Sequence, residues 1–337
     1  MLKQVNLSSI RRLMKNKGTV TRAQISWETR ISSTTVRSLL AEMQRNGEIE
    51  SVGYDESTGG RKAERYKLKT DLYYGAAFCI TESVIHYIVV NIYGDIVEKG
   101  KIEVLQGDIR EPIMLFLDNL TTQRKIRSIG IGVPGVVDGG GYLINIQENE
   151  INKVDIGVCL SQKYVVPVLL ENDLNAITLG FGRCYLRKFP YEHPENINIS
   201  FVYFDKGCIS AGFITGGRII RGYNNFAGEL SVIPADEHKS FGELMLKPMD
   251  DSQYTIYVTR IICYICSILN PQYIALGGPY FRKECLGPIC EGLYALLPRN
   301  MPAEILYSSD IWNDYYEGMA YLTAGQIFND VQLINIS

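Results

Sequence analysis

No stretch of the 337-residue sequence is apolar for long enough to cross a membrane. Residues 1–6 also lack the apolar segment of a secretory signal. The eight cysteines are scattered without the spacing of a disulfide framework, which is typical of reduced thiols. These absences predict a cytoplasmic protein with no membrane segment. The 46% hydrophobic and 21% charged residues predict a globular protein with a sizeable core.

Residue types that bind metals are few and dispersed. The chain has three histidines, and none lies beside the C-x-x-C formed by Cys263 and Cys266. The apolar neighbours of these cysteines favour buried structural thiols, with a redox or metal site as the alternative. Residues 261–269 form the longest apolar run, interrupted by Tyr264 and Ser267, and predict a buried helix.

Positive charge is concentrated at the N-terminus. Residues 1–70 hold 14 Lys and Arg against 7 Asp and Glu, a net charge of +7, whereas the remaining residues hold 20 against 30, a net charge of −10. A basic head on an acidic body indicates that only the head contacts a polyanion. A charged, solvated surface is the alternative interpretation.

Three short helices are predicted in the head. Ile10, Leu13 and Met14 recur at helical spacing, and Gly18 ends that helix. Thr21 is a candidate N-cap for a second helix. A third helix is expected from about residue 34 to 46, with one apolar face. That face carries Val36, Leu39, Leu40 and Met43. A tight turn at residues 31–33 separates the second and third helices, as in a helix-turn-helix.

The third helix would be the recognition helix. Its first turn offers short polar groups and one guanidinium, which suit phosphate and base-edge contacts in a major groove. These candidate DNA-binding residues are Ser33, Thr34, Thr35 and Arg37. A plain three-helix bundle would show the same apolar spacing.

A basic hairpin follows the third helix. Residues 49–54 and 63–68 predict two strands, and the turn between them contains two glycines. Gly60, Arg61 and Lys62 lie at its end, where the cations can contact a phosphate or a minor groove. A basic hairpin directly behind a helix-turn-helix predicts a winged helix-turn-helix that binds double-stranded DNA.

The rest of the chain has an α/β pattern. Residues 83–94 predict two strands of a meander, and residues 126–138 predict a strand that leads into a glycine-rich loop. Residues 165–176 predict a strand, a polar turn and the start of a helix. A further strand at residues 270–278 ends in paired glycines.

Four segments of this body resemble the ROK family of repressors, open reading frames and sugar kinases. They are GIGVPG at 130–135, ENDLNA at 171–176, AGEL at 227–230 and LGG at 276–278. The resemblance covers nearly the whole chain, and the wing tip at Gly59 to Arg61 is also similar to the family's repressors. It implies an actin/hexokinase-like (ribonuclease H-like) body with two lobes and a sugar site between them.

The resemblance also implies a division into three parts. Residues 1–70 would form the winged helix-turn-helix. The first lobe would comprise residues 71–180 and be completed by the C-terminal helix at about residues 310–337. The second lobe would comprise residues 181–309.

The loops that hold ATP phosphates in related kinases are altered here. The D-x-G-x-T loop is replaced by residues 75–83, where no aspartate occurs between Asp71 and Asp95. The G-T-G-x-G loop is replaced by residues 206–210, in which most glycines are lost. Side chains at these positions would block the close backbone approach that phosphate needs. We therefore predict a body that is not an enzyme and uses no cofactor.

The zinc motif of the family is missing as well. Leu230 and Ser231 follow Glu229 where the family continues to a histidine and a cysteine cluster, and no cysteine occurs between Cys208 and Cys263. His238 stands alone among charged residues, so we interpret it as a surface histidine. No metal site is predicted.

Four polar residues remain as candidate ligand contacts by resemblance: Asn149, Asn172, Asp173 and Glu229. Asp173 occupies the place of the kinases' catalytic aspartate and would accept a hydrogen bond from a sugar hydroxyl. For each residue, the alternative is a polar loop side chain satisfied by nearby backbone.

These features together predict a transcriptional regulator, specifically a repressor of carbohydrate-related genes. It would bind operator DNA as a homodimer or tetramer and sense a sugar or sugar derivative. One alternative is an active sugar kinase with an appended DNA-binding head. Another is a DNA-binding protein whose body serves only dimerisation or a protein partner.

Overall fold

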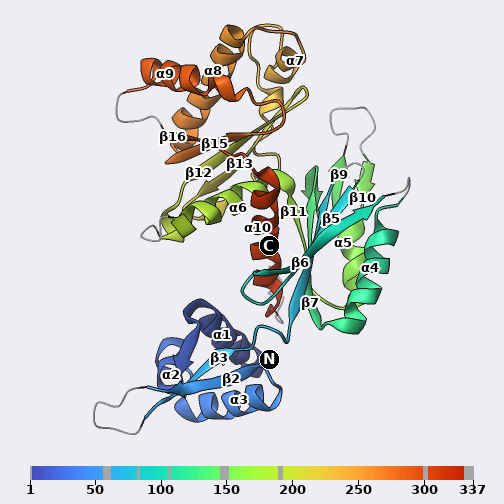
Figure 1. Cartoon of the computed structure of the whole chain (residues 1–337), viewed down its shortest axis with the longest axis vertical. Helices are drawn as coiled ribbons and strands as arrows, with labels where there is room; N and C mark the ends of the chain where they lie inside the picture. The colour runs from blue at the N-terminus through green and yellow to red at the C-terminus, as the bar shows by residue number, and fades with distance from the viewer. Residues whose placement is uncertain are drawn as a thin grey trace.

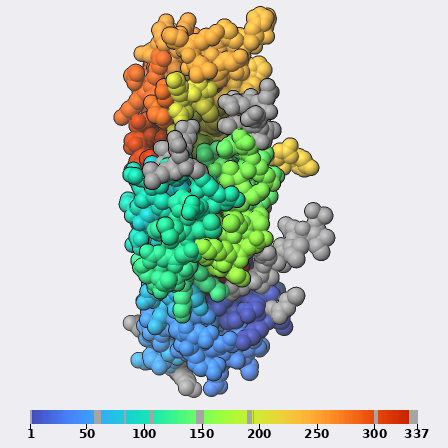
Figure 2. All heavy atoms as spheres, turned by 90° about the vertical axis from the view of Figure 1, so that its right-hand side faces the viewer, coloured from blue at the N-terminus to red at the C-terminus, as the bar shows by residue number. Residues whose placement is uncertain are grey.

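The computed structural model describes residues 2–55, 62–81, 84–104, 108–144, 152–188, 193–298 and 303–329. It has three parts in a row: the N-terminal head, a first lobe in the middle and a second lobe at the far end (Figure 1). The space-filling view shows the same order along the long axis (Figure 2). No helix in the described ranges is both long and apolar enough to span a bilayer.

The three expected helices of the head are present. They are α1 (Leu2–Lys17), α2 (Arg22–Thr29) and α3 (Ser33–Arg45). Thr21 caps α2 in a capping box with Gln24, which satisfies two backbone N–H groups at the helix start. The expected apolar face of α3 is buried, from Val36 to Met43. The head therefore has the geometry of a helix-turn-helix.

A three-stranded sheet completes the head, in the order β1-β3-β2. The hairpin strands are β2 (Ile49–Tyr54) and β3 (Glu64–Leu68), close to the expected bounds. The sequence interpretation missed β1 (Thr19–Thr21), whose three residues pair antiparallel with β3. This short strand joins α1 to the wing and makes the head a winged helix-turn-helix.

The first lobe contains a five-stranded sheet in the order β11-β7-β4-β5-β6. Its strands are β4 (Tyr74–Ile80), β5 (Val84–Val90), β6 (Ile96–Glu103), β7 (Ile126–Val133) and β11 (Val168–Asn172). Helices α4 (Arg110–Gln123) and α5 (Ile156–Tyr164) cover one face of the sheet (Figure 1). The prediction of two strands within residues 83–94 is wrong: β5 is one strand, and Asn91 closes the following turn by accepting from the N–H groups of Tyr93 and Asp95.

A small antiparallel sheet lies at the edge of this lobe, beside the second lobe. It comprises β8 (Val136–Asp138), β9 (Gly141–Ile144) and β10 (Asn152–Val154). Only glycine fits at position 135, where the chain enters this sheet, because a Cβ atom there would lie 2.3 Å from the carbonyl oxygen of Leu143. The glycine-rich loop expected after β7 is therefore a tight turn into β8.

The second lobe has its own five-stranded sheet, in the order β14-β13-β12-β15-β16. Its strands are β12 (Ile199–Asp205), β13 (Cys208–Thr215), β14 (Arg218–Ile219), β15 (Tyr273–Gly277) and β16 (Glu304–Tyr307). Its helices are α7 (Phe241–Met245), α8 (Asp251–Leu269) and α9 (Leu286–Leu296). Helix α8 is buried on one face only, since Ile268 at its end is 79% exposed.

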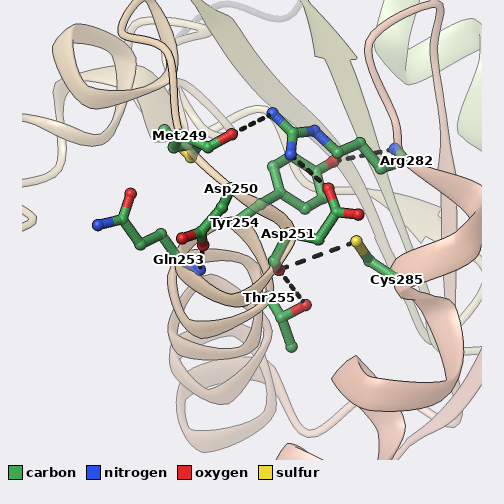
Figure 3. A network of polar contacts seen from close by, with 8 residues as sticks. All are labelled: Met249, Asp250, Asp251, Gln253, Tyr254, Thr255, Arg282 and Cys285. Atoms are coloured by element: carbon green, nitrogen blue, oxygen red, sulfur yellow. Dashed lines mark hydrogen bonds and ion pairs between the residues drawn. The ribbon is translucent and has the colours of Figure 1, made fainter.

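A polar network fixes the start of α8 to the segment after β15 (Figure 3). Arg282 donates to Asp251 Oδ1 at 2.6 Å and to the carbonyl oxygen of Met249 at 3.1 Å, and its guanidinium lies 4.7 Å from the centre of the Tyr254 ring. Asp250 caps the helix by accepting from the Gln253 N–H at 2.8 Å. These contacts hold the segment after the paired glycines against α8.

Two helices connect the lobes, α6 (Asp173–Lys188) and α10 (Ile311–Gln326), and they pack along each other. A Cβ atom on Gly180 would lie 1.7 Å from the carbonyl oxygen of Asp314, and one on Gly318 would lie 1.9 Å from that of Ala176. We call this the glycine crossing. Only glycine allows backbones to approach so closely.

The far end of α10 contacts the head. Lys15 of α1 donates to the carbonyl oxygen of Ala324 at 2.8 Å, and the Arg11 guanidinium lies 5.4 Å from the centre of the Phe328 ring. Apolar residues of α1 and of the α10 end belong to one continuous buried cluster. We call this contact the α1/α10 junction.

Candidate functional site: a cavity between the lobes

A cavity of about 610 Å³ lies where the two lobes face each other. Its walls come from the β7–β8 turn, the start of α6, strands β12 and β13, and residues 225–232. The polar groups that line it include Asn172, Asp173, Asn175, Tyr203, Asp205, Ser210, Asn225 and Glu229. Its size matches that of small-molecule sites in proteins.

Three of the four candidate ligand contacts line this cavity: Asn172, Asp173 and Glu229. Asn172 donates to the carbonyl oxygen of Gly135 at 3.2 Å and accepts from the Asn175 N–H at 3.2 Å. The last residue of β11 is thereby fixed against both the β7–β8 turn and α6. The fourth candidate, Asn149, lies outside the described residues.

Asp173 starts α6, and its Oδ1 accepts from the Leu174 N–H at 2.7 Å. Burial, with a smaller effect from the Glu229 carboxylate, raises the pKa of Asp173 to about 7. Burial also raises the pKa of Glu229. The cavity therefore holds two carboxyl groups that retain protons more readily than carboxyl groups in water, and either can accept or donate a hydrogen bond.

Glu171 lies behind these residues and is 1% exposed. It accepts from the Asn175 side chain at 2.9 Å and from the Asn172 N–H at 3.2 Å, and it forms an ion pair with Arg221 of the second lobe. A buried carboxylate needs such partners. The sequence interpretation missed Arg221 because it is 50 residues away and has no local signature.

The segment after β14 crosses back to the first lobe beside the cavity. Besides the Arg221 ion pair, the Asn225 side chain donates to the carbonyl oxygen of Val137 at 2.8 Å. Phe226 and Glu229 of the same segment line the cavity, and Tyr223 at its tip is fully exposed. The segment 220–229 therefore connects the lobes and forms one wall of the cavity.

The turn that replaces the second phosphate loop is narrow. Gly207 takes a φ of +65° between β12 and β13, and a Cβ on it would lie 2.3 Å from Leu246. The neighbouring cavity, beside Asp205 and Ile209, has a volume of about 70 Å³. Asp205 accepts from the Lys206 N–H at 2.7 Å, and with Cys208 and Ser210 it lines the cavity between the lobes.

Aromatic residues occupy the region beside the altered first phosphate loop. The ring of His86 on β5 stacks on Trp312 with ring centres 3.8 Å apart, and its Nδ1 forms a hydrogen bond with the Tyr316 hydroxyl. Cys79, opposite His86 on β4, is fully buried. Residues 82 and 83 lie outside the described residues. This packing fixes the start of α10 against β5.

Metal-ligating groups do not gather in the part of the chain that the structure describes. No three His, Cys, Asp or Glu side chains there come close enough to hold a metal ion. His238 is exposed, and its backbone N–H donates to Asp236. Cys266 is buried and Cys263 is half-buried, and both thiols are free.

The candidate DNA-binding residues of α3 lie at its first turn. Ser33, Thr34 and Arg37 are exposed, whereas Thr35 is half-buried and its hydroxyl bonds with that of Ser32 at 2.8 Å. Lys62 is exposed at the base of the wing. Gly60 and Arg61 lie outside the described residues.

The architecture defines a class: a winged helix-turn-helix head on an α/β body of two lobes with a ligand-sized cavity between them. A family model described as "ROK family" matches residues 81–243, and the chain carries a ROK family domain. A solved structure described as a ROK family transcriptional regulator, a homologue of the Escherichia coli MLC protein, is similar over 97% of this chain and 98% of that one. Its TM-score is 0.72 at 16% identity. The expected fold class is confirmed.

Curated relatives support the same family. A putative xylose repressor of Caldicellulosiruptor sp. (strain Rt8B.4) is 26% identical over 246 residues, 70% of this chain and 60% of the relative. The DNA-binding transcriptional dual regulator NagC of Escherichia coli (strain K12) is 24% identical over 257 residues, 70% of this chain and 59% of the relative. The chain thus aligns with about 60% of the length of these relatives.

Proposed function

We propose that this protein is a transcriptional repressor of carbohydrate-related genes, whose body senses a sugar or sugar derivative and is not an enzyme. The observation that carries the proposal is the continuous connection from the cavity to the head. Helix α6 begins at Asp173 in the cavity and packs along α10. The C-terminal end of α10 in turn contacts α1. The putative xylose repressor and the transcriptional dual regulator NagC among the relatives support the same function.

The head binds operator DNA through α3 and the wing. Ser33, Thr34, Thr35 and Arg37 face the major groove, and Gly60, Arg61 and Lys62 contact the flanking backbone or minor groove. The exposure of Ser33, Thr34, Arg37 and Lys62 supports this arrangement. Residues 1–70 act as the DNA-binding domain.

The body binds its effector in the cavity between the lobes. Asn172, Asp173 and Glu229, with Asn149 as a further contact, bind sugar hydroxyl groups. Residues 71–180 with about 310–337 form one lobe and residues 181–309 the other. Because α6 continues through residue 181 to Lys188, this helix is shared by the two lobes. A ligand that contacts both lobes changes how closely the lobes approach each other. This change alters the orientation of α10 relative to the head.

The Asp205 carboxylate lines the cavity between the lobes beside Cys208 and Ser210 of the altered second phosphate loop, which supports a body that does not use ATP. A triphosphate there would meet a negative charge and side chains in place of the backbone N–H groups of a glycine-rich loop. We further propose that the protein works in the cytoplasm as a homodimer or tetramer, which spaces two heads on the duplex.

DNA selected from a random pool provides an operator for a binding test by fluorescence anisotropy. Arg37→Ala should weaken operator binding by about 1–3 kcal/mol and relax specificity. Lys62→Ala should weaken binding to all sequences and lower its salt dependence. Lys239→Ala, in the second lobe, serves as the control. If wild-type protein selects no sequence, or both head variants bind as wild type does, the repressor proposal is wrong.

One observation keeps a sugar kinase as a second candidate. The pKa of Asp173, raised to about 7, suits a general base near neutral pH. A coupled assay of ATP consumption with a panel of hexoses and pentoses decides between the two. Sugar-dependent turnover that is lost in Asp173→Ala would establish the kinase.

A further inference from the structure

The cavity between the lobes extends beyond the residues that would bind one sugar ring, and its polar lining falls into two sets. The proximal set surrounds the start of α6 and consists of Asn172, Asp173, Asn175, Asn225 and Glu229. The distal set lies on β12 and β13 and consists of Tyr203, Asp205, Cys208 and Ser210. The distal set therefore gives the altered second phosphate loop side chains that face a ligand.

The register of β12 and β13 gives the distance between the two sets. The start of α6 lies over Gly212, where a Cβ atom would be 2.5 Å from the carbonyl oxygen of Leu174. The distal set forms two successive cross-strand pairs on this face, closer to the β12–β13 turn: Ser210 with Tyr203, and Cys208 with Asp205. These pairs lie two and four residues from Gly212, so at the usual strand rise the lining continues for roughly 7–13 Å. That length accommodates a second ring linked to the first.

Carboxyl groups belong to both sets. Asp173 and Glu229 are proximal and Asp205 is distal, whereas no Lys, Arg or His is among the described residues that line the cavity. Tyr203 interacts with both sets, since burial, followed by the charges of Asp205 and Asp173, raises the pKa of its hydroxyl to about 12. This hydroxyl remains a hydrogen-bond donor at neutral pH. Such a lining pairs with ligand hydroxyl groups and repels a phosphate or a carboxylate.

We propose that the effector is a neutral disaccharide, with one ring at the proximal set and the other at the distal set. This inference rests on the proposed sugar-sensing function and adds the length and the charge of the ligand. Asp205 accepts from a hydroxyl of the second ring while it keeps its bond from the Lys206 N–H, because a carboxylate has several acceptor sites. The Ser210 hydroxyl, 3.3 Å from the Cys208 thiol, contacts the same ring. A sugar phosphate is rejected because its charge would meet Asp205.

Calorimetric titration of the full chain tests the length and the charge of the ligand. The probes are glucose, galactose and xylose, their disaccharides cellobiose, maltose, lactose, melibiose and xylobiose, and glucose 6-phosphate. At least one disaccharide should bind at least tenfold more tightly than either of its component sugars. Glucose 6-phosphate should bind no more tightly than glucose.

A substitution in the distal set should act on the disaccharide alone. Asp205→Asn should weaken binding of the disaccharide about fivefold, because a hydrogen bond to a charged acceptor is lost, and binding of its component sugars less than twofold. Asp236→Asn is the matched control. Asp236 also accepts from backbone N–H groups, those of His238 and Lys239, but lies outside the residues that line the cavity.

Alkylation of Cys208 reports on the distal set directly. Cys208 is exposed, whereas Cys184 on α6 is half-buried and lies outside the lining of this cavity. The bound disaccharide should slow the reaction of Cys208 with iodoacetamide at least threefold, as measured by mass spectrometry of its peptide. A saturating component sugar should leave this rate unchanged, and the rate at Cys184 should be the same in both samples.

Three results would overturn the disaccharide proposal while sugar sensing stands. They are component sugars that bind as tightly as every disaccharide, glucose 6-phosphate that binds more tightly than all neutral probes, and a bound disaccharide that leaves Cys208 as reactive as before. If no sugar of either length binds, both this inference and the proposed sensing function are wrong.

Discussion

The two ends of α10 are held in different ways. At the glycine crossing, α10 meets α6 backbone to backbone, through Gly180 and Gly318. At the α1/α10 junction, the contact is made by side chains: a hydrogen bond from Lys15, the Arg11 guanidinium over the Phe328 ring, and the buried apolar cluster shared by α1 and the end of α10. A close backbone contact is rigid and intolerant of added atoms, whereas a contact between side chains can repack.

The difference indicates which contact can change during signalling. In the proposed mechanism, the glycine crossing keeps α6 and α10 together while the lobes rotate about it. In the same mechanism, the α1/α10 junction transmits that rotation to the head and is the contact that shifts.

Gly180→Ala should destabilise the protein by about 3 kcal/mol, because the new methyl group would overlap a backbone oxygen that cannot move aside. Gly325→Ala, in the partner helix α10 but with open space around it, should instead stabilise by about 0.5–1 kcal/mol. Urea unfolding measures both. Equal effects of the two substitutions would contradict a close glycine crossing.

Asp173→Asn should weaken binding of the cognate sugar by about 2 kcal/mol, roughly 30-fold, because a charge-assisted hydrogen bond is lost. Burial raises the pKa of Asp173 to about 7, so wild-type affinity should fall as the pH decreases from 8 to 6. The folded pKa exceeds the unfolded value, so the unliganded protein should gain stability as the pH falls from 7 toward 4. Calorimetric titration measures the pH dependence of sugar affinity, and Tm measured over the same pH range gives the pH dependence of stability. Both dependences should be weaker in Asp173→Asn.

Arg221→Ala should cost about 1–2 kcal/mol, because buried Glu171 keeps its neutral donors but loses its cation. The same substitution should loosen segment 220–229 and raise hydrogen exchange there, with little change at the α1/α10 junction. Arg218→Ala, an exposed arginine on β14, should stay within about 0.5 kcal/mol of wild type. If hydrogen exchange increased as much at the α1/α10 junction as in segment 220–229, the junction and this segment could not be treated as independent contacts.

Lys15 should make head docking depend weakly on pH. Its pKa is lowered to about 8 in the docked state, so the free head binds this proton more tightly. Docking therefore strengthens as the pH rises from 8 to 10, on the order of 1 kcal/mol after screening by solvent. Lys15→Met should remove the dependence. Lys17→Met should retain it, because Lys17 lies on the same helix as Lys15 but is exposed and forms an ion pair with Glu28 of α2. Hydrogen exchange of α1 at the two pH values is the measurement.

Much of the fold could be predicted because its signals are local. The cap at Thr21, the apolar face of α3 and the strand at 49–54 each follow from neighbouring residues. The turn within residues 83–94 was misplaced because an apolar run does not show where a strand ends. The strand β1 has only three residues and is stabilised by pairing with β3, which no local pattern reveals.

The candidate site was predictable on one side only. Asn172 and Asp173 belong to a recognisable strand–turn–helix segment, and Glu229 belongs to another short motif. The second lobe contributes Asp205 and Asn225 to the lining of the same cavity, and Arg221 to the ion pair with Glu171 behind it. Only the tertiary structure brings these residues to the site. Gly180 and Gly318 are ordinary helix residues in sequence, and their role depends on how two helices pack.

The most direct test of the account is operator binding by anisotropy with the cognate sugar, in the presence of Mg²⁺-ATP and with ATP consumption followed in the same sample. We predict that the sugar changes operator affinity at least tenfold, that Asp173→Asn abolishes the change without altering sugar-free binding, and that no ATP is consumed. ATP consumption that depends on sugar and Asp173, or operator affinity unaffected by any sugar that binds, would contradict a body that senses without phosphorylating.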